Sequence, residues 1–207
     1  MSIDWLDVLK ISASSSVLTA SIGWGLDHVF VHRATLKKDA RYLAQRVAII
    51  LEKFAVHCGN SITDNELHDR SEGHAGERHL TLPAIGPFPA EADWKAIDTD
   101  LMDRALSMPN ELALADQAIL FWWNVVGDEE CMQTEANNRA GECGLRAWLL
   151  ASELRRRCGI PASTLPATSW DFVNTLRRQV EAAEAQRRKK QDNEGNESPI
   201  LATEGPN

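Results

Sequence analysis

The chain has 207 residues, 43% of them hydrophobic and 25% charged, which is typical of a globular protein with one sizeable core. The formal net charge of −8 disfavours general attraction to phosphate backbones, so we expect no nucleic-acid partner. The cysteines show neither a CxxC pair nor a zinc-ligand spacing, which predicts reduced and mostly buried thiols in a cytoplasmic domain. They are Cys58, Cys131, Cys143 and Cys158.

The first notable segment is the uncharged stretch ISASSSVLTASIGWGL, residues 11–26. A helix over residues 11–31 would be about 31 Å long, enough for a hydrocarbon core of about 30 Å, although Asp27 and His28 fall inside it. Acidic residues precede the stretch and cations follow it, so the C-terminal part would be cytoplasmic. We therefore predict an anchor helix over residues 1–32, single-pass in the inner (cytoplasmic) membrane. A soluble helix of a cytoplasmic protein is the alternative.

Small and polar residues recur in this segment at steps of three and four, which places them on one face of a helix. Such a seam allows two helices to approach closely in lipid. We therefore expect two partners for the segment, the lipid bilayer and a second copy of the chain. The seam consists of Ser12, Ser16, Thr19, Gly23 and Asp27.

The next helix is predicted over residues 36–62, with its apolar side chains at helical spacing. Its opposite face, with Lys38, Arg41 and Glu52, reads as solvated. A long loop with glycines and prolines is expected over residues 63–98, and its part LTLPAIGPFP reads as an extended strap against the helices. The apolar face consists of Leu36, Ala40, Leu43, Val47, Ile50, Phe54, Cys58 and Ile62.

A short helix is predicted over residues 100–107, ended by Pro109, and a second one from Asn110 to Gly127. The second helix is apolar on two sides, which favours a central position between neighbours. One stripe consists of Leu112, Ala115, Ile119, Trp122 and Val126, and the other of Leu114, Ala118, Phe121 and Val125.

A helix capped by Asp128 should end at ELRRRCGIP, where Arg155, Arg156 and Arg157 fit a helix C-terminus. A last helix begins near Ser169 and fades before a tail, residues 191–207, that we expect to be disordered. The predicted fold is thus all-α. The N-terminal helix is followed by a bundle of about four helices over residues 33–190, which includes the long loop.

The loop holds the only cluster of candidate metal ligands, in the segment HDRSEGHAGERH. His68, His74 and His79, together with neighbouring carboxylates, offer nitrogen and oxygen ligands to a divalent metal. Their spacing matches no established ligand pattern, so a polar loop with incidental histidines is the competing interpretation. No other cofactor is expected, because the sequence contains no HExxH, P-loop or GxSxG motif.

Several segments resemble a group of uncharacterised bacterial proteins that begin with a weakly apolar N-terminal segment. They are SEGHAGERHLTLP, DWKAID, FWWNVVGDEE, GLRAWLLASELRRRCGIP and WDFVNTLR. The resemblance implies a bacterial source and this domain layout, with no activity to carry over.

The sequence thus favours a membrane-anchored helical interaction or regulatory protein without catalysis, whose bundle binds an unknown protein partner. A metal-dependent enzyme that uses the loop of residues 68–79 is one alternative. A soluble helical oligomer is the other.

Overall fold

Four α-helices carry the chain in the computed structural model, which describes the backbone of residues 5–165 and 170–197 and the side chains of residues 37–165 and 170–193. They are α1 (Trp5–Arg70), α2 (Thr99–Phe121), α3 (Glu129–Arg157) and α4 (Phe172–Glu197). The 3₁₀ turn η1 (Trp94–Ala96) precedes α2, and the π-helical turn η2 (Trp122–Val126) follows it. None of the described residues forms a β-strand, so the predicted all-α class is confirmed.

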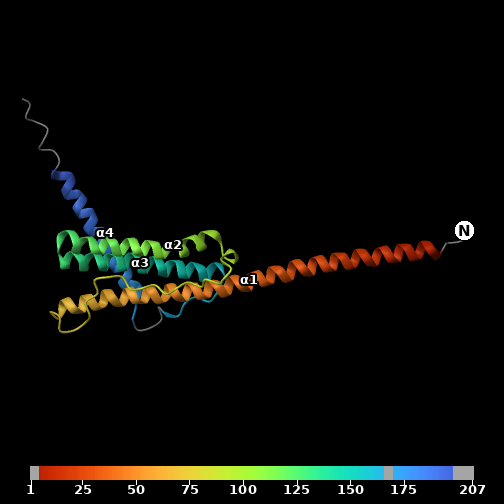
Figure 1. Ribbon diagram of the computed structural model, residues 1–207, viewed down its shortest axis with the longest axis horizontal. Coiled ribbons are helices and arrows are strands. Elements are labelled where there is room, and N and C mark those ends of the chain that lie inside the picture. The colour runs from red at the N-terminus through yellow and green to blue at the C-terminus, as the bar shows by residue number, and fades with distance from the viewer. Residues whose placement is uncertain (1–4, 166–169, 198–207) are drawn as a thin grey trace, which may run out of the picture.

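The longest element is α1, whose 66 residues give a rod about 100 Å long. It runs without a break through the predicted boundary between an anchor and a bundle helix at residues 32–33. Its first half extends away from the other helices as an arm (Figure 1). No helix in the described part of the chain is long and apolar enough to cross a membrane.

The second half of α1 packs along α3, and α3 lies between α1 and α2 (Figure 1). The contact between α1 and α3 is close because small buried side chains line both helices, among them Ala48, Ala55, Ala140 and Ala147. At Gly144 a Cβ atom would lie only 2.7 Å from the Cβ of Cys58 on α1. Of the described residues on the predicted apolar face of α1, five are buried: Leu43, Val47, Phe54, Cys58 and Ile62.

The loop begins at residue 71 rather than at 63, because the last two turns of α1 are held by the returning chain. The side-chain amide of Asn65 makes both bonds: its Nδ2 donates to the backbone carbonyl of His79 at 2.9 Å, and its Oδ1 accepts from the His79 N–H at 2.7 Å. Beyond this point the loop lies along the helices as the predicted strap. Its apolar side chains Leu80, Leu82, Ile85, Phe88 and Trp94 pack on the core.

Two predictions for α2 are wrong. The helix does not end at Pro109, since Thr99–Phe121 is one continuous helix with the proline on its exposed side. A proline facing solvent leaves the carbonyl one turn earlier without its backbone donor and still permits the helix to continue. Nor is α2 central, because it is packed on one side by α3 and the strap while its other side is open.

The last helix, α4, packs on α1 and α3 through its first turns, where Phe172 and Leu176 are buried. The ring of Phe172 meets that of Trp148 edge-on at 5.3 Å. The final turns of α4 project beyond the bundle (Figure 1). The helix runs to Glu197, so residues 191–197 of the tail expected to be disordered are helical, and the rest of that tail lies outside the described residues.

Candidate functional site

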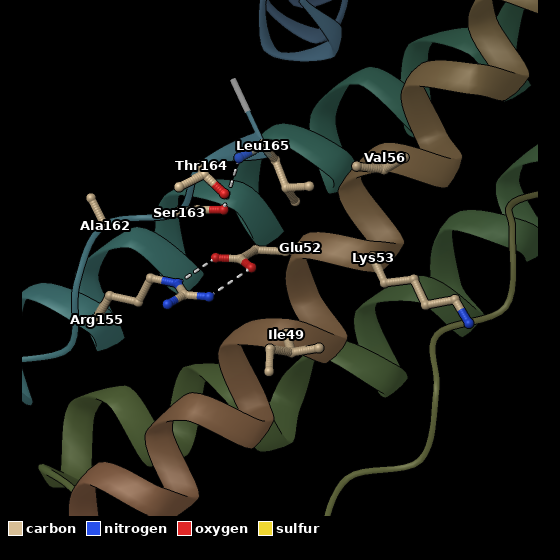
Figure 2. Close-up of a pocket in the computed structure, with 9 residues that line it drawn as sticks. All are labelled: Ile49, Glu52, Lys53, Val56, Arg155, Ala162, Ser163, Thr164 and Leu165. Carbon is tan, nitrogen blue, oxygen red and sulfur yellow. Dashed lines mark hydrogen bonds and ion pairs between the residues drawn. The ribbon is translucent and has the colours of Figure 1, made fainter. Parts of the chain in front are cut away.

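A pocket of about 470 Å³ lies between α1, the end of α3 and the segment that follows α3. Figure 2 shows its lining residues. Ile49 and Val56 from α1 and Leu165 from the following segment supply apolar walls. Ser163 and Thr164 add two hydroxyl groups at the rim.

The polar centre of the pocket is an ion pair between Glu52 of α1 and Arg155 of α3. Arg155 donates from Nε to Oε1 at 2.5 Å and from Nη2 to Oε2 at 3.0 Å, while its Nη1 donates to the carbonyl of Pro161 at 3.0 Å. The two side chains are only 6% and 14% exposed. Their hydrogen bonds raise the pKa of the Arg155 guanidinium, against the opposing effect of burial.

This pair corrects two interpretations of the sequence. Glu52 does not belong to a solvated face, and Arg155 does more than end a helix. One signal in the sequence was available for Glu52. Its neighbours one turn away on either side, Ala48 and Ala55, are small and apolar, which is unusual on a solvated face.

The pocket holds little that is ready for catalysis. Both carboxylate oxygens of Glu52 are engaged by Arg155, and Lys53 turns away from the pair (Figure 2). Neither histidine nor cysteine is among the described residues that line it. The ion pair connects α1 with α3, and the bond from Arg155 to Pro161 connects both to the segment after α3. These contacts are structural, and the pocket lies open above them.

The three predicted metal ligands lie at the far end of α1. His79 is fixed there, with its Nε2 at 3.2 Å from Oδ2 of Asp64 and its backbone held by Asn65. His68 is in the last turn of α1, and His74 follows in the turn beyond it. Within the described residues, no group of three or more histidine, cysteine, aspartate or glutamate side chains is placed to hold a metal ion.

The cysteines are free thiols, as far as the described residues go. Burial raises the pKa of Cys58 well above its ordinary value, and the nearby Cys143 raises it further. Burial also raises the pKa of Cys143 to about 11. At neutral pH both groups are therefore protonated, which suits packing rather than nucleophilic chemistry. Cys131 and Cys158 are half-buried.

The predicted seam lies in the arm of α1. The backbone there is helical, which preserves the one-face spacing of Ser12, Ser16, Thr19, Gly23 and Asp27, but their side chains lie outside the described residues.

A second candidate site is an exposed apolar surface at the end of the bundle, which we call the α2–η2 apolar face. Leu114 and Val125 are each 65% exposed, and Phe121 lies between them at helical spacing with half of its surface open. Leu114, Phe121 and Val125 make up this face, and Leu120, Trp123 and Val126 are further exposed apolar side chains of α2 and η2.

The π-helical turn shapes this surface. Gly127 donates to the carbonyl of Trp122 at 2.9 Å, which closes a wider turn than that of an α-helix, and it adopts a left-handed φ of 70°. Trp122 packs on the core, with its ring edge-on to Phe121 at 5.9 Å, while Trp123 is 54% exposed. Two adjacent tryptophans are thus divided between core and surface.

The sequence had indicated this face as the second apolar stripe of the helix, but assigned it to a neighbour within the chain.

When the chain is compared with known protein families, curated proteins and solved structures, no match of significance is found to any of them.

Proposed function

We propose that the protein acts by association, through its N-terminal arm and through its bundle, rather than by catalysis. The observation that carries the proposal is the course of α1, a single helix whose first half leaves the bundle as an arm (Figure 1). A helix that extends away from its own domain needs a partner, because isolated helices in water are only marginally stable.

The arm's sequence favours a second copy of the arm as that partner. The seam of small and polar residues permits close approach, and hydroxyl groups along it offer hydrogen bonds across the contact. Insertion into a bilayer, with the bundle on the cytoplasmic side, is the form of attachment that the flanking charges favour.

Two leucine substitutions with opposite placement test the proposal in the full-length protein. Ser16→Leu fills the seam, whereas Ser14→Leu adds the same side chain on the opposite face of the helix. We expect the wild type and Ser14→Leu to have at least twice the 23.0 kDa mass of one chain in sedimentation analysis, and Ser16→Leu to shift toward the monomer. Because both variants gain the same hydropathy, a difference between them reports packing.

Flotation with liposomes, followed by a carbonate wash, tests the attachment to a bilayer. Protein that stays with the vesicles supports insertion of the arm. A protein that is monomeric in solution and in detergent, and that does not float with vesicles, would refute association through the arm.

A further inference from the structure

We propose that a pocket at the junction of the arm and the bundle binds the phosphate headgroup of an anionic lipid, with the beginning of an acyl chain on its apolar floor. The proposal rests on the proposed attachment to a bilayer for the source of the lipid. The pocket itself is tested with soluble ligands, without a bilayer.

The cavity lies where the arm leaves the bundle, between α1, the turn η1 with the start of α2, and the end of α3 (Figure 1). We call it the junction pocket. Its volume is about 620 Å³, within the range of about 300–1,000 Å³ that small-molecule sites occupy. Lys37, Ala40 and Arg41 line it from α1, and the buried side chains of Ile97 and Leu101 belong to its floor. None of the described residues that line it is aromatic, so the floor suits an aliphatic chain better than a ring that needs a stacking partner.

The positive charge at the junction pocket is available to a ligand. Lys37 and Arg41 are both exposed, and they are one turn apart on α1, which makes their side chains neighbours. Among the described residues, neither has a carboxylate partner. The other charged residues that line the pocket, Asp98 and Arg157, already pair with each other at 3.4 Å. Two free cations therefore border the pocket, while the carboxylate that lines it is engaged.

This concentration of positive charge is local. Residues 33–53 contain six lysines and arginines and only two acidic residues, although the whole chain has a net charge of −8. One of the two acids, Glu52, is bonded to Arg155. A phosphate group has enough oxygens to accept from a lysine and an arginine together, whereas a zwitterionic headgroup brings a cation of its own. An anionic phosphate headgroup therefore fits the pocket better than a neutral one.

The position of the pocket fits the proposed attachment to a bilayer. Lys37 lies six residues beyond the predicted span of residues 11–31, which is about 9 Å along a helix. The headgroup region on each side of the hydrocarbon core is about 5–8 Å thick, so the mouth of the pocket would face the headgroups. Basic residues at this level attract the anionic lipids of the cytoplasmic leaflet.

The first test titrates the full-length protein with two soluble lipids, dihexanoyl phosphatidic acid and dihexanoyl phosphatidylcholine. They share their acyl chains and differ in the net charge of the headgroup. We expect the phosphatidic acid to bind roughly tenfold or more tightly in calorimetry, and inorganic phosphate, which has no chain, to bind more weakly than the phosphatidic acid. Equal binding of the two lipids would overturn the proposal. Phosphate that binds as tightly as the phosphatidic acid would assign the pocket to a free anion rather than to a lipid.

Two double variants with the same loss of charge test the place of binding. Lys37→Gln/Arg41→Gln removes the free cations of the pocket and should weaken the binding of phosphatidic acid roughly tenfold or more. Lys38→Gln/Arg46→Gln removes two cations of the same helix that do not line the pocket. It should bind like the wild type at physiological ionic strength, where exposed charges more than about 8 Å apart are largely screened. Equal losses in the two variants would reveal attraction to net charge alone and would refute the pocket. All four side chains are exposed, so unaltered thermal unfolding verifies that the variants are folded.

Ala40→Phe tests the apolar part of the pocket, because it fills the cavity and leaves both cations in place. The variant should bind phosphatidic acid more weakly and inorganic phosphate as the wild type does. Undiminished binding of phosphatidic acid would show that no acyl chain enters the pocket.

Flotation with vesicles separates this proposal from the attachment of the arm. Phosphatidylcholine vesicles that contain phosphatidic acid should carry more of the wild type than vesicles of phosphatidylcholine alone, and only Lys37→Gln/Arg41→Gln should lose this difference. A protein that binds soluble phosphatidic acid but floats with neither kind of vesicle would refute attachment through the arm and keep the pocket. A protein that floats with both kinds equally and does not distinguish the two soluble lipids would keep the attachment and refute the pocket.

Discussion

Replacing Arg155 by methionine tests whether Glu52 is held in a desolvated pair. The substitution keeps an unbranched apolar stem and leaves a carboxylate that is 6% exposed without its cation. Removal of one partner from such a buried pair costs about 3–5 kcal/mol of the free energy of unfolding. Domains of this kind have about 5–15 kcal/mol in total, so the variant should lose a large part of its stability.

The companion variants separate the charge from the packing. Glu52→Leu leaves a guanidinium that is 14% exposed and still bonded to the carbonyl of Pro161, so a smaller loss of about 1–3 kcal/mol is expected. The double variant Glu52→Leu/Arg155→Met replaces the pair by apolar side chains, and its stability should lie within about 1 kcal/mol of the wild type.

Urea unfolding followed by far-UV circular dichroism measures all four proteins of this cycle. A surface pair serves as the matched control. Arg178 on α4 reaches Glu66 on α1 at 2.9 Å, but its side chain is 59% exposed, so Arg178→Met should cost less than about 1 kcal/mol. If Arg155→Met costs no more than Arg178→Met, water reaches Glu52 and the argument from burial is wrong.

Two further predictions concern the ends of helices. Gly76→Ala should lower the free energy of unfolding by about 2–5 kcal/mol, because φ is +79° and the new Cβ would lie 2.5 Å and 2.8 Å from two backbone atoms of α1. Gly73→Ala, with φ at +84° and no atom closer than 3.4 Å, should cost about 1 kcal/mol; equal losses in thermal unfolding would contradict the close approach. At the start of α3, hydrogen bonds from two backbone N–H groups lower the pKa of Asp128. Their stabilisation is complete above the ordinary aspartate pKa of about 3.9 and is lost as the pH falls through the lowered value in the folded state. Asp128→Asn should therefore lose less stability on acidification than the wild type, and parallel stability curves from pH 7 to the acid range would refute this.

Much of the helical organisation follows from local patterns in the sequence. The spacing of Leu43, Val47 and Phe54 predicted the apolar face of α1, and these residues are buried. Asp128 was predicted as the cap of α3, and it accepts from two N–H groups there. These features depend on residues within one or two turns of each other, which is the range that periodicity and capping rules describe.

The errors arise where distant parts of the chain decide the local structure. The end of α1 persists to Arg70 because Asn65 is bonded to a backbone group 14 residues away, which no local pattern reveals. Glu52 was interpreted as solvated because its partner Arg155 is 103 residues distant. In both cases a polar side chain gained a partner through the fold, and residue type alone predicted the wrong environment.

The position of α2 shows a different limit. Its two apolar stripes are present in the helix, but only the first is largely buried. Two apolar stripes predict that two sides of a helix are covered, and periodicity carries no information on whether the cover belongs to the same chain. Leu112 and Ile119 are buried, whereas Leu114 and Phe121 are exposed. Periodicity therefore overstates how much of α2 is covered by its own chain.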